Sequence, residues 1–252
     1  MWHSYAEAVN STFVVDNRYQ IFLDGIKNTL IITAGALVVG VILGVLVAIT
    51  RVYYLQNGPY SFWKSLWNFL RTGHIEYLSQ ALLKLINIFL GIYLTVFRGT
   101  PVVVQLMIWA FVVFSKTNEI TVAIIGFGIN SGAYVAEIVR AGIMAVDKGQ
   151  TEASRSLGLS AIATMRLIVL PQAFKNILPA LGNEIIALVK ETSIAGYIAV
   201  TDLTKAASLV RARTFDAFVP LLFVATVYLL MVMLLTVVQQ QIEKAMRTGD
   251  RK

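Results

Sequence analysis

Cysteine is absent from this sequence of 252 residues, and charged residues are scarce. Without cysteine the chain can form neither a disulfide nor a thiolate metal site. Asp, Glu, Lys and Arg make up 14% of the residues, whereas soluble globular proteins contain about 25%. Hydrophobic residues reach 57%. The deficit of charge leaves uncharged runs long enough to cross a bilayer, which excludes an ordinary soluble domain.

The motifs of nucleotide binding and catalysis are missing as well. No G-x-x-x-x-G-K-[S/T] segment occurs, so we expect no phosphate-binding loop in this chain. The two histidines, His3 and His74, are isolated in the sequence, and we expect each to be a surface residue. We therefore predict no catalytic residue and no metal site. The net charge of +7 forms no basic stripe, which points to lipid headgroups and cytoplasmic loops rather than to nucleic acid.

Five segments have the length and hydrophobicity of membrane spans, each with about 20 mostly apolar residues. We place them at approximately residues 26–50, 86–114, 120–146, 178–200 and 217–240. In the second segment we place the span proper after Pro101, because proline suits the first position of a helix, and we expect an interfacial or kinked helix before it. The sequence thus predicts an all-α integral membrane protein with a single transmembrane domain over residues 1–252.

The distribution of basic residues predicts the orientation. Five spans place the two termini on opposite sides of the membrane. Lys and Arg are more frequent in the segments on the side of the C-terminus, which favours a cytoplasmic C-terminus and an outer N-terminus. No basic region precedes the first apolar run, so we expect no cleaved signal peptide and insertion through the first span.

Residues 57–79, between the first two spans, form an insertion with amphipathic spacing. Apolar side chains recur at helical intervals, and polar side chains occupy the other faces. The apolar positions are Phe62, Trp63, Leu66, Trp67 and Leu70, and the polar ones are Lys64, Asn68 and Arg71. A helix that lies in the membrane interface has this pattern. A short helix packed on the cytoplasmic end of the bundle has it too, and both interpretations remain open.

The cytoplasmic loop at residues 147–175 has the pattern of a helix–turn–helix. Residues 151–157 favour a helix, and Gly158 stands where a left-handed residue would end it. Ser160 is a natural N-cap for a second helix over residues 161–170.

Pro171 then interrupts or ends that second helix. Leu157 and Leu159 come near the tip of the expected turn. An exposed element of this kind suits docking into a groove on a partner, although an ordinary amphipathic loop gives the same pattern.

The loop resembles the EAA loop of permease subunits in bacterial ABC importers. That pattern is Glu-Ala-Ala, three residues, Gly, nine residues, Ile, one residue and Leu-Pro. The matching residues here are Glu152, Ala153, Gly158, Ile168, Leu170 and Pro171, and Ser154 replaces the second alanine. The resemblance implies that the loop couples to an ATPase subunit. The expected coupling residues are Glu152, Ala153, Ser154, Leu157, Gly158, Leu159, Ile168, Leu170 and Pro171.

Further segments are similar to one branch of these permeases, the histidine/glutamine-permease-like branch for polar amino acids. The segment Arg98, Gly99, Thr100 and Pro101 resembles the motif that opens the second span in that branch. Residues 134–140 and 188–193 are similar to it as well, and the likeness covers roughly residues 29–238. These branch motifs imply amino-acid transport.

Polar residues at membrane depth are candidates for a substrate path, because a charge there costs about 2.5 kcal/mol or more unless it faces a cavity or a partner. The candidates are Gln105, Asn130, Glu137, Asn183, Glu191, Thr192 and Ser193. Glu137 and Arg140 are three residues apart and are also placed to pair with each other. Glu184 and Lys190 are placed to brace the loop or a partner permease, so a structural role remains open for this helix. Its acidic groups hint at a cationic substrate.

The resemblance implies a complete importer around this chain, in a bacterial cytoplasmic (inner) membrane. The expected partners are two ATPase subunits that bind ATP and Mg, a second copy or a homologous permease, an extracytoplasmic amino-acid-binding protein and the lipid bilayer. The chain itself is expected to be no enzyme and to bind no cofactor or nucleic acid.

The alternative is an ion-coupled secondary carrier or a passive channel, and a membrane enzyme is disfavoured because no catalytic set converges. No half of the sequence repeats the other, as the halves of many secondary transporters do. The sequence leaves open which amino acid is carried, whether the permeases form a homodimer or a heterodimer, and whether this chain holds a specific substrate site.

Overall fold

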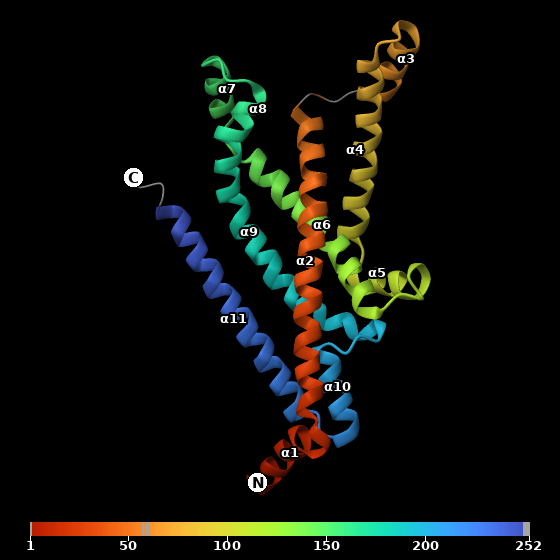
Figure 1. The fold of residues 1–252 in the computed structure, drawn as a ribbon, viewed down its shortest axis with the longest axis vertical. Coiled ribbons are helices and arrows are strands. Elements are labelled where there is room, and N and C mark those ends of the chain that lie inside the picture. Colours follow the sequence, from red (N-terminus) through yellow and green to blue (C-terminus); the bar gives the residue numbers. More distant parts are fainter. Residues whose placement is uncertain (1, 57, 59–60, 249–252) are drawn as a thin grey trace. The chain divides into compact units, whose positions relative to one another are not determined.

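The computed structural model describes residues 2–56, 58 and 61–248, and every regular element in these ranges is a helix (Figure 1). The all-α prediction is therefore confirmed for the described part of the chain. Asn57, Pro59 and Tyr60 of the predicted insertion lie outside the described residues, as do the basic residues Arg251 and Lys252.

The helices follow one another with short connections. The α-helices are α1 Trp2–Phe13, α2 Tyr19–Gln56, α3 Phe62–Thr72, α4 Ile75–Gly99, α5 Val102–Ile108, α6 Glu119–Met144, α7 Lys148–Ser156, α8 Ala161–Thr164, α9 Leu170–Glu191, α10 Leu203–Thr214 and α11 Phe218–Thr248. The shorter elements are the 3₁₀ turns η1 Val15–Asn17 and η4 Thr192–Ile198, and the π-helical turns η2 Trp109–Val113 and η3 Met165–Val169.

Four helical segments within the described residues are long and apolar enough to cross a membrane. They are Val15–Gln56, Ile75–Gly99, Glu119–Met144 and Phe218–Met246. The predicted fourth span at residues 178–200 falls on α9 and η4 and is not among the four; α9 ends at Glu191 and carries two lysines and two glutamates.

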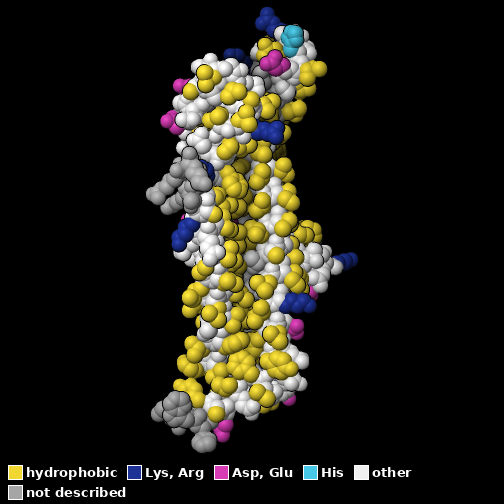
Figure 2. Space-filling view, turned by 60° about the vertical axis from the view of Figure 1, so that its left-hand side comes forward, with side chains coloured by type: hydrophobic (Ala, Val, Ile, Leu, Met, Phe, Trp, Pro, Cys, Tyr) yellow, Lys and Arg dark blue, Asp and Glu magenta, His cyan; other side chains and the backbone are white. Residues whose placement is uncertain are grey.

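The apolar side chains of α11 are largely exposed. Leu229, Leu230 and Leu234 expose 58%, 59% and 66% of their surface, and hydrophobic side chains cover much of the visible face in Figure 2. Lipid tails solvate such side chains, whereas water does not.

The placement of the second span after Pro101 was wrong. The long helix is α4, which precedes Pro101, and α5 after it has only seven residues before the turn η2. Thr100 is extended, with φ −120° and ψ 150°, because a proline pushes the preceding residue out of the helical region. Pro101 also offers no N–H to continue the hydrogen bonds of α4. The segment 86–114 is therefore a helix, a break and a short helix.

Pro171 does not end its helix, but the regular α-helix is interrupted by a π turn just before it, so the prediction of an interruption or an end is confirmed in part. The elements α8, η3 and α9 follow one another without a gap. In the π turn η3 the Leu170 N–H bonds to the carbonyl of Met165, five residues back. Such a wider turn next to a proline relieves the clash with the preceding carbonyls, so the helix continues.

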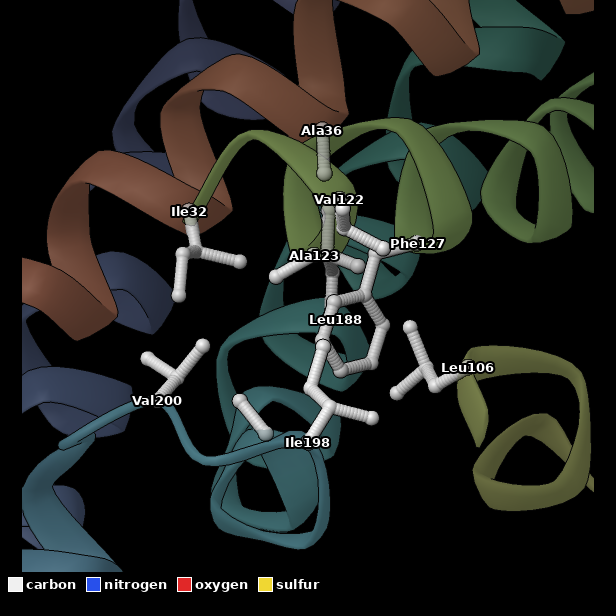
Figure 3. Close-up of a cluster of buried hydrophobic side chains, with 10 residues drawn as sticks. Ile32, Ala36, Leu106, Val122, Ala123, Phe127, Leu188, Ile198 and Val200 are labelled. Atoms are coloured by element: carbon white, nitrogen blue, oxygen red, sulfur yellow. The ribbon is translucent and has the colours of Figure 1, made fainter. Parts of the chain in front are cut away.

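The chain forms two compact units. The first consists of Met1–Val39, Pro101–Ser131 and Gly182–Lys252, and the second of Gly40–Thr100 and Gly132–Leu181. The core of the first unit joins α2, α5, α6, α9 and η4 (Figure 3). Its buried side chains include Ile32, Leu106, Phe127, Leu188 and Ile198.

The core of the second unit contains Val135 and Val139 of α6, Ala48 of α2 and Ala173 of α9. A methyl group on Gly44 would lie only 2.6 Å from the side chain of Val135, so glycine permits the close approach of α2 and α6 there.

Candidate functional site

The helix–turn–helix predicted around Gly158 is present in the second unit. Gly158 has φ +88° and follows the C-cap residue Leu157, and the N–H of Leu159 bonds to the carbonyl of Ser154 at 3.1 Å. No atom lies within 4 Å of a methyl group built on Gly158, so the backbone conformation rather than space demands glycine. The hydroxyl of Ser160 accepts from the N–H of Ala163 at 3.1 Å, which confirms the predicted N-cap.

The first helix of this element begins earlier than expected, at Lys148 instead of Thr151. The reason is an N-cap that the prediction missed. The carboxylate of Asp147 accepts from the N–H of Gly149 at 2.8 Å, and aspartate is among the best N-cap residues.

The turn presents apolar side chains to the surroundings. Leu157 is 85% exposed and Ile162 is 82% exposed, whereas Leu159 is half-buried. A guanidinium N–H of Arg155 donates to the carbonyl of Leu159 at 2.7 Å and fixes the turn. Among the remaining predicted coupling residues, Ser154 is buried and the others are exposed or half-buried. The exposed or half-buried residues are Glu152, Ala153, Ile168, Leu170 and Pro171.

Ser154, the residue that departs from the EAA pattern, is 5% exposed and lies between the two short helices. Its hydroxyl donates to the carbonyl of Thr151 at 3.0 Å and lies 3.2 Å from the buried hydroxyl of Thr164, in a hydrogen bond between α7 and α8. The serine therefore braces the turn in a way that alanine cannot.

A group of polar side chains from α5, α6 and α9 meets in the first unit. The amide of Asn130 donates to the side-chain oxygen of Gln105 at 2.9 Å, and the hydroxyl of Ser131 donates to the carboxylate of Glu184 at 2.7 Å. Gln105, Asn130 and Ser131 are buried, and Glu184 is half-buried. The structure thus brings Gln105 and Asn130 together, as two of the predicted path residues.

The other predicted residues of α9 and η4 have different surroundings. Asn183 is exposed and accepts from the amide of Gln239 in α11 at 3.3 Å. Thr192 is buried, and its hydroxyl donates to the carbonyl of Val189 at 2.6 Å.

Glu191 and Ser193 are half-buried. Glu191 follows Glu184 by seven residues, so the two carboxylates share one face of α9. That face carries two acidic side chains.

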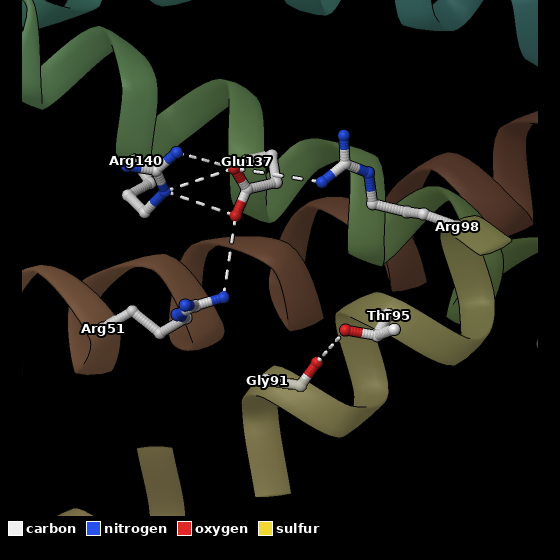
Figure 4. Close-up of polar contacts among 6 residues, drawn as sticks. All are labelled: Arg51, Gly91, Thr95, Arg98, Glu137 and Arg140. Atoms are coloured by element: carbon white, nitrogen blue, oxygen red, sulfur yellow. Dashed lines mark hydrogen bonds and ion pairs between the residues drawn. The ribbon is translucent and has the colours of Figure 1, made fainter. Parts of the chain in front are cut away.

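Glu137 belongs to the second unit and is surrounded by three arginines (Figure 4). Arg140 binds both of its oxygens, with a shortest distance of 2.7 Å, which confirms the pairing that the sequence suggested. Arg51 of α2 and Arg98 of α4 approach the same carboxylate at 3.7 Å and 3.9 Å. From its position in the sequence Arg51 was expected only to end the first span, and its proximity to Glu137 could not be predicted from spacing alone.

The motif from Arg98 to Pro101 forms the end of α4 and the break before α5. The hydroxyl of Thr100 donates to the carbonyl of Val96 at 2.8 Å, which satisfies one of the last carbonyls of α4. The guanidinium of Arg98 lies 5.5 Å from the centre of the Tyr134 ring. Thr95, Arg98 and Glu137 line a pocket in this unit, together with Gly91 and Arg51.

Residues 79–248 match the family described as "Binding-protein-dependent transport system inner membrane component". A putative glutamine transport system permease protein of Rickettsia typhi is 41% identical over 165 residues, which cover 64% of this chain and 76% of the relative. The arginine transport system permease protein of Bacillus subtilis is 40% identical over 162 residues, which cover 63% of this chain and 74% of the relative.

Solved structures agree with this assignment. The crystal structure of an amino acid ABC transporter with histidines superimposes with a TM-score of 0.75 at 34% identity, covering 92% of this chain and 98% of that chain. An inward-facing structure of the MetNI methionine ABC transporter reaches a TM-score of 0.68 at 18% identity, covering 90% and 96%, and supports the fold alone. The chain therefore belongs to the binding-protein-dependent transport system inner membrane components, and it is a permease subunit of an ABC importer rather than an enzyme.

Proposed function

We propose that this permease translocates a polar amino acid and that a separate ATPase drives it through the helix–turn–helix at Gly158. The similar proteins named above are permeases for glutamine and for arginine, and a solved relative is an amino acid transporter. The residues from Glu152 to Pro171 transmit force and perform no bond chemistry.

The observation that carries the coupling role is the exposed apolar tip of the turn. Leu157 and Ile162 are more than four-fifths exposed, yet their backbone is fixed by the cap at Ser160 and the bond from Arg155. Burial of one such side chain contributes about 1.5–3 kcal/mol. A groove on an ATPase subunit would gain this energy without having to order the turn first.

The assembly that we propose contains two ATPase subunits, which bind ATP and Mg, and a second copy of this chain or a homologous permease. An extracytoplasmic binding protein delivers the amino acid. This chain holds no ATP site and no cofactor of its own. It crosses the membrane five times, with the N-terminus outside and the C-terminus in the cytoplasm, and α9 is the least apolar of the five crossings.

The substrate path includes the polar group of the first unit. Gln105, Asn130 and Glu184 offer amide and carboxylate groups on three helices, and Glu191 adds a second negative charge on the same face of α9. Lys190 is exposed and is the one cation within this stretch of α9. Two carboxylates against one exposed lysine favour a substrate with a positively charged side chain.

Asn183 and Ser193 lie at the edges of this path, with groups that can bind a polar substrate. Thr192 and Glu137 serve the structure instead, because each already has its own partner, the carbonyl of Val189 and the arginines.

The decisive experiment is substrate-stimulated ATP hydrolysis in proteoliposomes that contain this chain, its ATPase and its binding protein. A panel of polar amino acids includes arginine, lysine, histidine and glutamine. Gly158→Trp is compared with Gly73→Trp, which places the same bulk at another glycine of positive φ in the same unit, also with open space around it.

We expect one class of amino acid to stimulate hydrolysis, Gly158→Trp to abolish the stimulation and Gly73→Trp to retain it. Equal effects of the two variants would remove the coupling role of the turn. Uptake that continues without ATP and follows an ion gradient would instead establish the secondary carrier.

A further inference from the structure

The helix α3 lies outside the segment that matches the family, because that match begins at residue 79. One side of α3 packs on the first turns of α4, beside which it folds back (Figure 1). Ser65 on this side is 5% exposed, and its hydroxyl lies 3.4 Å from the side-chain oxygen of Gln80. Gly73, with φ +70°, ends the helix and reverses the chain. The helix therefore has a fixed orientation on α4.

A second side of α3 is apolar and has no cover within the described residues. Trp63, Trp67 and Leu70 follow one another at intervals of four and three residues, so they form one stripe. They expose 77%, 67% and 71% of their surface. Aromatic side chains of this size bury about 150–250 Å² each when they are covered, so the stripe is a substantial apolar surface.

A basic stripe runs next to the apolar one. Lys64 and Arg71 are seven residues apart on the same face, and both are exposed. Successive residues of an α-helix are rotated by about 100° around its axis. Arg71, four residues after Trp67, therefore lies about 40° further around the helix than Trp67. The helix contains no Asp or Glu, so its surface next to the tryptophans is positive. Such a surface is complementary to phosphate groups.

The position of α3 in the chain ties it to the membrane surface. It connects α2 to α4, two of the candidate spans, through residues 57–61 and through Gly73–His74. The longer of these connections reaches at most about 18 Å. The 25 residues of α4 are about 38 Å long and exceed a hydrocarbon core of about 30 Å by about 8 Å. α3 packs on the first turns of α4, and an excess at this end would place α3 at the depth of the headgroup layer.

We propose that α3 lies in the headgroup layer of a bilayer that contains anionic lipids. Trp63, Trp67 and Leu70 insert among the upper acyl chains, and Lys64 and Arg71 bind the lipid phosphates. Tryptophan at this depth and long basic side chains beside it are the arrangement of interfacial helices. The inference requires only that the chain spans a membrane, and it holds for any transported substrate.

Quenching of tryptophan fluorescence by brominated lipids tests the insertion in the full-length protein. Trp2→Phe and Trp109→Phe leave Trp63 and Trp67 as the only emitters. In bilayers whose phosphatidylglycerol carries bromine near the top of the acyl chain, we expect strong quenching. Unquenched emission that soluble acrylamide suppresses would overturn the proposal. Protection from acrylamide that develops only after the ATPase subunit is added would assign the stripe to a protein partner instead.

The role of the basic stripe is tested with mixtures of brominated phosphatidylglycerol and phosphatidylcholine. The double substitution Lys64→Gln and Arg71→Gln is made in the same two-tryptophan background. We expect the preference for the anionic lipid to fall about fivefold for each charge removed. The control is Arg211→Gln with Arg213→Gln, which removes two exposed charges from α10 and should leave the preference unchanged. An unchanged preference in the α3 variant, or an equal loss in the control, would refute the phosphate contacts.

Discussion

Carboxylates in the two units of this permease have opposite surroundings. In the second unit, Glu137 is contacted by Arg51, Arg98 and Arg140 at 3.7 Å, 3.9 Å and 2.7 Å. In the first unit, Glu184 accepts a hydrogen bond from the neutral hydroxyl of Ser131, and Glu191 shares its helix face. Three arginines surround the carboxylate of Glu137, so positive charge is in excess there. Around Glu184 and Glu191, negative charge is in excess.

This difference is the basis for assigning Glu137 a structural role and Glu184 and Glu191 a place in the proposed substrate path. Glu137 links α2, α4 and α6 by pairing with cations that are already present, so it needs no ligand. A surplus of negative charge at membrane depth costs energy until a cation arrives. The polar group of the first unit is therefore the better candidate for binding a transported molecule, and substitutions at three carboxylates test this contrast.

Glu137→Gln should have the largest effect on stability, because it leaves three arginines without their shared counter-ion. Loss of one partner from a fully buried ion pair costs about 3–5 kcal/mol, and we expect about 2 kcal/mol here, since 22% of the Glu137 side chain is exposed. Thermal unfolding of the purified permease in nanodiscs measures the loss. Glu76→Gln, at an exposed position in α4, is the matched control and should leave the unfolding temperature unchanged. An unfolding temperature equal to that of wild type would mean that the cluster does not hold the helices together.

Unlike Glu137→Gln, Glu184→Gln should impair transport and cause little loss of stability. Glutamine retains an oxygen that can accept from Ser131, so only the negative charge is removed. We expect transport of arginine or lysine at low concentration to fall about tenfold, a change of about 1.4 kcal/mol, with a smaller effect on glutamine.

Uptake assays with each amino acid make the comparison, and Glu119→Gln at an exposed position of α6 is the control. An equal loss for charged and neutral substrates would show that the negative charge does not select the substrate.

Asp202 is another carboxylate of the first unit, and its hydrogen-bond donors are backbone N–H groups. Substitutions of Asp202 should have the smallest effect of the three positions. Asp202 is fully buried at the N-cap of α10 and accepts from the N–H groups of Thr204 and Lys205 at 2.9 Å and 3.3 Å. Asp202→Ala removes the cap and should cost about 1 kcal/mol. Asp202→Asn keeps the cap and should be close to wild type at neutral pH.

Wild type and Asp202→Asn together test the effect of burial on the carboxylate of Asp202. Burial raises the pKa of Asp202, although the two backbone N–H groups oppose the shift. A raised pKa in the folded state means that protonation favours folding, so this stabilising contribution is lost as the pH rises from the unfolded pKa through the folded one. The unfolding temperature of wild type should therefore decline relative to Asp202→Asn over that interval. A constant difference between the two proteins would show that the pKa is the same in both states.

The sequence predicted the local structure of the coupling turn well, because caps are short-range. Gly158 and Ser160 each have a conformational preference that neighbouring residues can only reinforce. The effect of prolines was harder to predict. Pro101 and Pro171 both follow apolar runs, yet the helix breaks at Pro101 and continues past Pro171, where a π turn precedes the proline.

Contacts between distant segments were only partly predictable. The Glu137–Arg140 pair follows from helical spacing, but Arg51 and Arg98 reach Glu137 from other helices, which no local pattern encodes. Asn130 and Gln105 were both selected as polar residues in apolar surroundings, and their mutual hydrogen bond needed the packing of α5 on α6.

The π turn before Pro171 has a mechanical consequence for the proposed coupling role. Because α8, η3 and α9 follow one another without a gap, the segment from Ala161 to Leu181 in the second unit contains no loop residue. A partner that pushes on Leu157 and Ile162 would thus act on one end of a continuous helical segment within the second unit. Two glycines inserted after Thr164 would interrupt this segment while leaving the docking tip intact.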